Sequence, residues 1–169
     1  MEPLTPSDTL ATLTASPLFK DWKKEHADSY LSHFFCPMSK VFQPSALWDV
    51  GYFNPQDQKI TVFRDLGTSF ERMPEEDVFK KESTAVEPLN MKKVVFPFAK
   101  AATFVHDNVS SLFPKEQCGD GFLILQNVSN TMLWNFTFIS ASLKFLNVKI
   151  NAKDGKLYSH QEVNVVQRE

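Results

Sequence analysis

The chain has little glycine and few cysteines, and it has no long hydrophobic run. Five glycines in 169 residues do not fit a collagen-like or low-complexity chain. So few glycines also disfavour a phosphate-binding loop built from backbone N–H groups. No stretch approaches the roughly 18 apolar residues that a membrane-spanning helix needs. The first residues lack the basic and apolar segments of a secretory signal, so we expect a cytoplasmic protein.

The two cysteines, Cys36 and Cys118, are far apart and form neither a CxxC motif nor a zinc-ligand spacing. They could form one disulfide, but two buried, reduced thiols fit a cytoplasmic chain better. A reactive thiol needs a nearby cation or helix N-terminus, and only Lys115 is close to Cys118 in sequence. We therefore expect neither cysteine to be catalytic.

Charge gives no sign of a nucleic-acid or membrane partner. The formal net charge is −2, which provides no general attraction to polyanions or anionic lipids. Residues 1–90 carry 9 Lys/Arg and 14 Asp/Glu, whereas residues 91–169 carry 9 and 6. Opposite signs would help two halves dock, although ordinary solvated faces account for the same difference.

Catalytic, metal and cofactor motifs are missing from the sequence. There is no G-x-S-x-G, P-loop, G-x-G-x-x-G or H-E-x-x-H motif. His26 and His33 are seven residues apart on a predicted helix, too far for one metal to bridge comfortably. The acidic run Glu75-Glu76-Asp77 suits a helix N-terminus better than a catalytic pair. We expect no cofactor and no metal.

The sequence of the first half of the chain predicts helices followed by a hairpin. Helical spacing predicts helices over Ser7–Ala15 and Leu18–Phe35, the second ended by a proline. Leu47–Phe53 and Lys59–Arg64 read as two strands joined by a polar, proline-containing turn. An acidic start predicts a short helix over residues 74–81.

The second half reads as one helix followed by a strand meander. Phe98, Ala101, Ala102, Val105, Val109 and Leu112 form one apolar stripe of a helix. Period-two alternation then predicts strands at Phe122–Gln126, Trp134–Phe138, Leu146–Ala152 and Leu157–Gln161, with Asp154-Gly155 as the last turn. Helices separated from antiparallel strands define an α+β fold. We expect a helix-plus-hairpin subdomain over 1–90 and a helix-plus-meander subdomain over 91–169, which can pack as one compact unit.

Two short similarities suggest an internal duplication. Leu47-Trp48-Asp49-Val50 resembles Leu133-Trp134-Asn135-Phe136, and the turn at 54–60 resembles the turn at 151–157. The offsets, 86 and 97 residues, do not fit one ungapped repeat, so the duplication stays open.

One segment is similar to a signature of the form v-D-A-x-x-G-k-v, with Asn151 in place of the usual Asp. It is Ile150-Asn151-Ala152-Lys153-Asp154-Gly155-Lys156-Leu157. Together with the helix that ends at Leu112-Phe113-Pro114, it makes the stretch from Phe98 to Gln161 resemble PepSY-like and cystatin-like small domains. The resemblance implies one helix packed on an antiparallel meander. It also implies a non-catalytic module, of a kind often associated with inhibiting or regulating peptidases or with binding at cell envelopes.

One face of the predicted meander mixes apolar and polar side chains. It should carry Asn135, Thr137, Ile139, Phe145, Asn147, Lys149, Asn151, Tyr158 and His160. Such a mixture suits a contact surface, or a docking face for residues 1–90. The candidate binding residues are Asn135, Asn147 and Lys149. The tryptophans Trp22, Trp48 and Trp134 are expected to be core anchors rather than pocket walls.

Three functional hypotheses follow from the sequence. The first is a non-catalytic binding or interaction module for an unknown protein or small ligand, with a regulatory role. The second is a small-ligand carrier or enzyme with a pocket between a helix and a curved sheet. The third is a homodimer formed through a sheet edge or a sheet face. The absence of catalytic motifs favours the first.

Overall fold

The computed structural model describes residues 5–77 and 86–165. This part of the chain contains three α-helices, one short 3-10 helix and nine strands. In chain order they are α1 (Pro6–Ala15), α2 (Pro17–Glu25), β1 (Tyr30–Met38), β2 (Asp49–Asn54), β3 (Lys59–Asp65), β4 (Phe70–Arg72), β5 (Glu76–Asp77), η1 (Met91–Lys93), α3 (Phe98–Leu112), β6 (Cys118–Val128), β7 (Thr131–Ser140), β8 (Lys144–Asn151) and β9 (Leu157–Asn164). Helices and antiparallel strands are separate along the chain, so the α+β class is confirmed.

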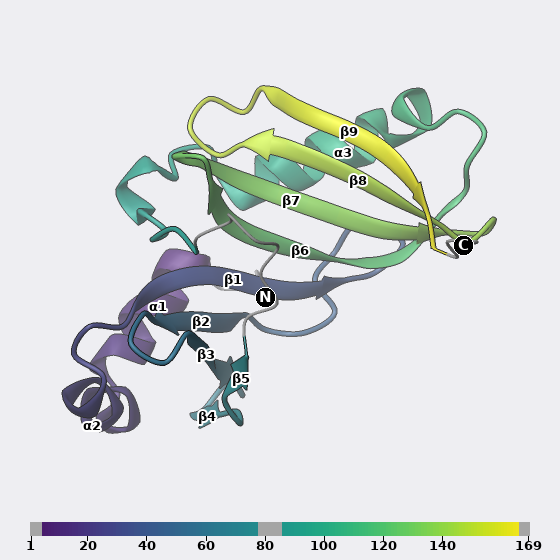
Figure 1. Ribbon diagram of the computed structural model, residues 1–169. Coiled ribbons are helices and arrows are strands. Elements are labelled where there is room, and N and C mark those ends of the chain that lie inside the picture. The colour runs from purple at the N-terminus through teal and green to yellow at the C-terminus, as the bar shows by residue number, and fades with distance from the viewer. Residues whose placement is uncertain (1–4, 78–85, 166–169) are drawn as a thin grey trace.

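The strands form a single antiparallel sheet in the order β4-β3-β2-β1-β6-β7-β8-β9, with β5 also pairing with β3. Figure 1 shows β9 at one edge of the sheet and β4 and β5 at the other. The first strands of the two halves, β1 and β6, meet in the middle and place Phe34 opposite Leu125 and Cys36 opposite Leu123. Hydrogen bonding between β1 and β6 therefore joins the two halves of the chain.

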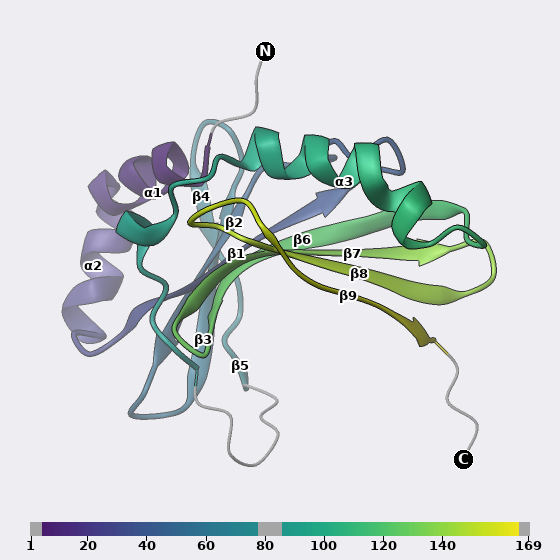
Figure 2. The same ribbon diagram turned by 90° about the horizontal axis from the view of Figure 1, so that it is seen from above.

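All three helices lie on one face of the sheet, which we call the helix face; the other is the open face (Figure 2). On the helix face, α3 buries Ala101, Val105 and Val109. The sheet residues buried there include Leu123, Leu125, Trp134, Phe136, Phe138, Leu146, Val148 and Ile150, each at most 1% exposed. Burying one such side chain contributes about 1.5–3 kcal/mol, so this layer provides much of the hydrophobic stabilisation.

The first half has its own aromatic cluster beneath α2. Phe19 and Trp22 of α2 pack on Tyr52 of β2 and Phe63 of β3, with ring centroids 5.0 to 5.8 Å apart. The helix begins as the sequence predicts, because the Ser16 hydroxyl accepts a hydrogen bond from the Phe19 N–H at 3.2 Å. A serine cap followed by proline therefore sets the start of the helix that covers this cluster.

The predicted helix over Leu18–Phe35 is wrong beyond Glu25. α2 ends there, and the chain from Tyr30 onward is strand β1. The Lys23 ammonium group lies over the end of the helix and donates to the Ala27 carbonyl at 3.0 Å. In a longer helix, a backbone N–H of the next turn would have donated to this carbonyl. The register of β1 with β2 shifts at Ser32, and beyond it every second residue of β1 is buried on the helix face: Phe34, Cys36 and Met38.

Pro37 lies inside β1 rather than beyond a helix. The pairing of β1 with β2 ends at Phe35 opposite Asp49. The Pro37 carbonyl faces the following loop, where it accepts from the Ser45 N–H at 2.9 Å. In a strand, the N–H and C=O of one residue point to the same side, so the missing N–H faces this loop and not β6. A proline is tolerated in a sheet at such a position.

The short helix predicted over residues 74–81 is wrong for residues 74–77, and residues 78–81 lie outside the described residues. Glu76 and Asp77 form β5, opposite Ile60 and Lys59 of β3. An acidic side chain opposite Lys59 stabilises the extended pairing. The remaining predicted elements are confirmed with small shifts of their ends: α1, α3, the β2–β3 hairpin and the strands β6 to β9.

The two predicted subdomains share one sheet. The described strands of residues 1–90 extend the sheet sideways from β6 and do not stack on the open face of the meander. The docking of residues 1–90 onto that face is therefore wrong for the described residues. The division at residue 90 stays a prediction.

Trp134 links the helix layer to the sheet. Its side chain is 1% exposed, its indole N–H donates to the Phe96 carbonyl at 2.9 Å, and its ring lies 5.9 Å from that of Phe98. Its prediction as a core anchor is confirmed.

We expect Trp134→Ala to lower the free energy of unfolding by about 3–5 kcal/mol, because it opens a cavity and leaves the Phe96 carbonyl unpaired. Urea denaturation followed by circular dichroism measures this loss. Val95→Ala, at a side chain that is 65% exposed, is the control and should change stability by less than about 0.5 kcal/mol. Wild-type stability for Trp134→Ala would contradict the burial described here.

Candidate binding face

The open face carries a polar group framed by apolar side chains. The strand register places Asn135 of β7 opposite Lys149 of β8, and Thr137 opposite Asn147. The predicted residues Asn135, Asn147 and Lys149 therefore lie together on this face. Apolar side chains frame them, namely Phe35 on β1, Phe122 and Ile124 on β6, Ile139 on β7 and Phe145 on β8. We call this set the binding face.

Asn147 orders the polar group at the centre of the binding face. Its amide Nδ2 lies 2.6 Å from the Asn135 Oδ1, 3.0 Å from the Thr137 Oγ1 and 3.1 Å from the Phe136 carbonyl. The Asn147 side chain is 8% exposed, and its Oδ1 is buried without a protein partner. An amide nitrogen with three acceptors around it fixes its neighbours, so the polar group is ordered before any partner binds.

The apolar frame includes a residue that sequence reasoning missed. Phe35 was assigned to a helix, but in β1 it stacks on Phe122 of β6, with ring centroids 5.7 Å apart and planes at 29°. Both rings are half-buried. Period-two alternation over Ser32, Phe34 and Cys36 was the signal that could have placed Phe35 on this face.

Two residues predicted for this face lie elsewhere. His160 is opposite Val148 on the helix face, where its ring contacts Phe113 at 5.8 Å. A register shift between Lys149 and Ile150 places Tyr158 at a bulge of β9. A bulge adds one residue to a strand and so reverses the faces on either side of it, which strict alternation does not anticipate.

His33 lies beside the binding face at the junction of β1 and β2. Its imidazole packs on Gly51, where an added Cβ would lie 2.1 Å from the ring, and its Nδ1 is 2.9 Å from the Ser32 hydroxyl. Burial lowers the pKa of His33 to about 4, and the nearby Asp49 carboxylate opposes this shift. Asp49 is itself paired with Arg64 at 3.1 Å. His33 is therefore a neutral, structural histidine at pH 7.

Both cysteines are free thiols; Cys36 is buried as predicted, whereas Cys118 is only half-buried. Burial raises the pKa of Cys36 to about 12 and that of Cys118 to about 11. Because the thiolate is the nucleophilic form, neither thiol is activated for covalent chemistry.

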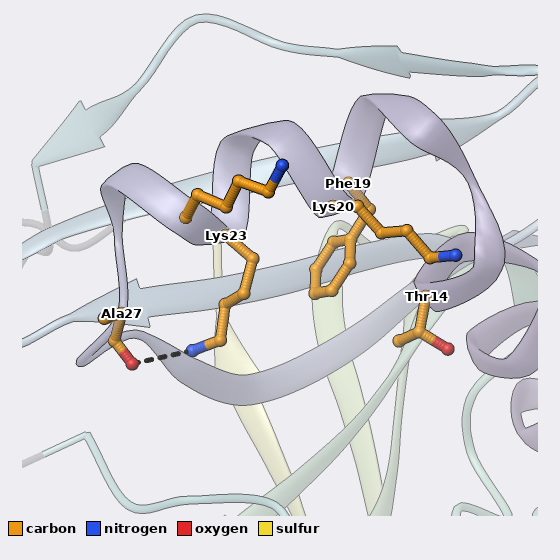
Figure 3. A pocket seen from close by; sticks show the side chains of 6 residues that line it. Thr14, Phe19, Lys20, Lys23 and Ala27 are labelled. Atoms are coloured by element: carbon orange, nitrogen blue, oxygen red, sulfur yellow. Dashed lines mark hydrogen bonds between the residues drawn. The ribbon is translucent and has the colours of Figure 1, made fainter.

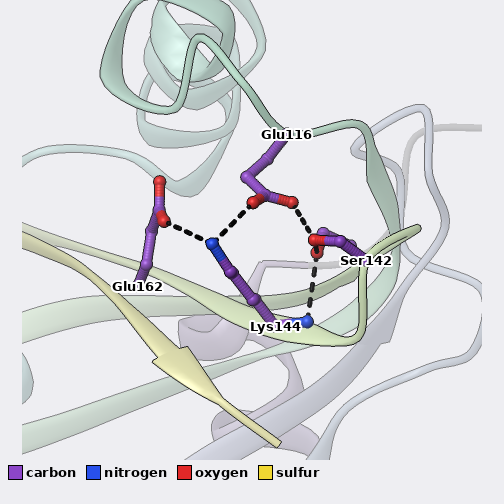
Figure 4. Close-up of polar contacts among 5 residues, drawn as sticks. Glu116, Ser142, Lys144 and Glu162 are labelled. Atoms are coloured by element: carbon purple, nitrogen blue, oxygen red, sulfur yellow. Dashed lines mark hydrogen bonds and ion pairs between the residues drawn. The ribbon is translucent and has the colours of Figure 1, made fainter.

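A second polar cluster closes the end of the β7–β8 hairpin (Figure 4). The Glu116 carboxylate, 4% exposed, accepts from the Ser142 hydroxyl and pairs with the Lys144 ammonium at 3.1 Å. Lys144 also reaches Glu162 of β9 at 3.4 Å. Hydrogen bonds from Ser142, Lys144 and Ser140 lower the pKa of Glu116, while the two carboxylates raise the pKa of Lys144. A charged lysine cannot serve as a base. The contacts of this cluster instead connect the loop after α3 to the sheet.

A shallow hollow lies between the end of α1 and α2 (Figure 3). Phe19 forms its floor, and Thr14, Lys20, Lys23, Lys24 and Ala27 surround it. The Lys23 ammonium is engaged with backbone carbonyls at the end of α2. The hollow is open to solvent and has no convergent set of acid, base or nucleophile.

The space between the helices and the sheet is filled by side chains. Val105 of α3 and Trp134, Phe136 and Phe138 of β7 are each at most 1% exposed. Over residues 5–77 and 86–165, no group of three His, Cys, Asp or Glu side chains is placed to hold a metal ion. Among the helices of these same residues, none has the length and apolarity to cross a membrane.

The sequence matches no protein-family model, and no curated protein is significantly similar to it. Among solved structures, the chain is similar to a protein described as a putative lipoprotein from Clostridium difficile 630, with a TM-score of 0.48 and 9% sequence identity. The similarity covers 86% of this chain and 90% of that chain. The class of this protein is therefore defined by its own architecture, an α+β domain with helices on one face of a nine-stranded antiparallel sheet.

We expect Asn147→Asp to lower the free energy of unfolding by about 1–3 kcal/mol at pH 7, because a carboxylate cannot donate to the Asn135 Oδ1 or the Phe136 carbonyl as the amide does. The loss should shrink below pH 5, where a protonated acid can donate again. Urea denaturation at pH 7 and pH 4.5 measures both values. Asn135→Asp is the matched control, since position 135 already supplies an acceptor to Asn147. Equal losses for the two variants would contradict the donor role of Asn147.

The lowered pKa of His33 predicts a loss of stability in acid. The pKa of His33 in the folded protein, about 4, lies below the ordinary histidine value of 6.5, so between these pH values the unfolded chain binds the proton more tightly. The contribution of neutral His33 to the free energy of unfolding is therefore complete above pH 6.5. It is lost as pH falls towards 4, and the free energy of unfolding drops by at most about 3 kcal/mol. His33→Gln should show a smaller drop in unfolding free energy over this window than the wild type. Identical pH profiles would contradict burial of a neutral imidazole.

Proposed function

We propose that this protein is a non-catalytic binding module and that its binding face contacts a protein partner. The observation that carries the proposal is a half-exposed apolar frame around a polar group that is already ordered by Asn147. Interfaces combine apolar anchors with satisfied polar groups in this way. A group ordered in advance also loses less conformational entropy on binding.

The shape of the binding face favours a protein over a small molecule. Its members lie on four neighbouring strands, β1, β6, β7 and β8, and therefore spread over a broad surface. Ile139 is 43% exposed and Val163, opposite Phe145 on β9, is 40% exposed. Small-molecule sites, in contrast, are concave and enclose most of their ligand.

The second hypothesis, a carrier or enzyme with a pocket between helix and sheet, has less support. The aromatic side chains of β7 fill the space that such a pocket would need. The two thiols have raised pKa values, and the most perturbed histidine, His33, packs against Gly51. These features suit stability rather than turnover.

We also infer that the two halves are divergent copies of one helix-plus-meander unit. The strand order is symmetric about the β1–β6 pair, with β2, β3 and β4 on one side and β7, β8 and β9 on the other. An offset of 86 residues brings β2 onto β7 and β3 onto β8, and it relates Trp48 to Trp134, which both contact Phe98. The offset of 97 would instead relate the β2–β3 turn to the β8–β9 turn, which occupy different places in the two meanders.

The duplicated unit has the arrangement implied by the resemblance to PepSY-like and cystatin-like domains, one helix followed by an antiparallel meander. That resemblance supports a binding or regulatory role rather than catalysis. The cytoplasmic location stays a prediction that rests on sequence alone.

Affinity capture from cells of the source organism tests the proposed face. Ile139→Asp places a charge on the binding face, whereas Leu66→Asp alters an exposed apolar side chain outside it (52% exposed). A partner that is captured by wild type and by Leu66→Asp should be lost with Ile139→Asp. With that partner purified, calorimetry should give a dissociation constant at least about tenfold weaker for Ile139→Asp.

Equal binding of the purified partner to wild type and to Ile139→Asp would contradict the proposed face. Failure of the wild-type protein to retain any partner would contradict the protein-binding function. Circular dichroism and thermal melting of both variants keep a folding defect from being mistaken for lost binding.

A further inference from the structure

The two edges of the sheet differ in how they are protected from pairing with another strand. β4 has three residues and β5 has two, and Pro74 lies between them. Short strands and proline are common protections of sheet edges. β9 has eight residues and no lysine or proline, and no described strand pairs with its outer side. Its register shift with β8 lies at Tyr158, so residues 159–164 present a regular edge that can accept a strand.

The hydrogen bonds to β8 show which backbone groups of β9 are free. The Val165 N–H donates to the Leu143 carbonyl at 3.2 Å, in the same register that places Val163 opposite Phe145 and Gln161 opposite Asn147. In an antiparallel ladder, alternate pairs exchange hydrogen bonds. The odd-numbered residues of β9 thus bond to β8, and the even-numbered residues point their N–H and C=O groups outward.

These outward groups restrict how a second copy of β9 can pair with the first. Antiparallel pairing must place even-numbered residues opposite even-numbered residues, so that both donors and acceptors meet. A register centred on His160 sets two histidines opposite each other, and a register centred on Glu162 sets two carboxylates opposite each other. The register centred on Gln161 instead sets His160 of each copy opposite Glu162 of the other.

The geometry points to a homodimer in which β9 of two copies pairs antiparallel about Gln161, with reciprocal His160–Glu162 contacts. The partner is a second copy because this strand is complementary to itself in backbone and side-chain hydrogen bonding: the imidazole of His160 in one copy can donate to the Glu162 carboxylate of the other. A hydrogen bond to a carboxylate stabilises a pair of facing strands, and like charges opposite each other destabilise it. The sequence His-Gln-Glu supplies this reciprocity in one register only.

The dimer would extend the proposed function without depending on it. A two-fold axis perpendicular to the sheet at Gln161 keeps the helices of both copies on one side. The two open faces then lie on the same side of one continuous sheet, which would present two binding faces to a partner. Loss of partner binding in Ile139→Asp tests the face, whereas the variants below test the β9 edge.

Sedimentation velocity over a range of concentrations tests the dimer. The wild type should form dimers, and His160→Glu should raise the dimer dissociation constant at least about tenfold by placing carboxylates opposite each other. His160→Glu combined with Glu162→His exchanges the two side chains and should restore dimerisation, because each imidazole again faces a carboxylate. His106→Glu, on the exposed face of α3, is the matched control and should dimerise as the wild type does.

Hydrogen exchange on the wild-type chain gives a second readout that needs no variant. Amides of His160, Glu162 and Asn164 should become protected as concentration rises, whereas that of Gln161 should be protected throughout. A wild-type monomer up to about 200 µM, unchanged dimerisation in His160→Glu, or no rescue by the exchange of the two side chains would each overturn the proposal. Concentration-independent exchange of the even-numbered amides would overturn it as well.

Discussion

The pairing of β1 with β6 is the interaction on which the rest of the structure depends. It joins the two halves of the chain at the centre of one sheet, with Cys36 opposite Leu123 and Phe34 opposite Leu125. All four of these side chains are fully buried on the helix face. Because one continuous sheet results, both groups of helices cover the same face, and no helix of residues 5–77 and 86–165 covers the other face.

This arrangement separates the close-packed core from the proposed binding face. The helix face holds the close-packed aromatic core, from the cluster under α2 to Trp134 under α3. Interiors packed in this way tolerate little change in the volume or shape of their side chains. The open face instead carries a few ordered polar groups among half-buried apolar ones. Binding at the open face is therefore compatible with a rigid scaffold beneath it.

Sequence reasoning succeeded where the chain obeys a simple period and failed where the period changes. The alternation from Trp134 to Ile150 placed Asn135, Asn147 and Lys149 on one face, and the strand register bears this out. The helix over Leu18–Phe35 was wrong because Trp22, Tyr30 and Phe34 happen to fit helical spacing. The alternation of Ser32, Phe34 and Cys36, which settles the strand, contains a serine that a hydrophobicity pattern overlooks.

Contacts between distant segments could not be read from the chain. The stacking of Phe35 on Phe122 and the packing of His33 on Gly51 both require knowledge of which strands are neighbours. Local sequence predicts strands better than it predicts their order, because pairing depends on long-range burial. The same reason explains why docking of residues 1–90 onto the meander was expected in place of a shared sheet.

Native-state hydrogen exchange along β1 and β6 tests the joining of the two halves most directly. If one sheet unites them, the central amides of both strands should open only with global unfolding and share one free energy equal to that from denaturant melts. Two groups of amides with clearly different opening free energies, one in residues 5–77 and the other in 86–165, would contradict the account.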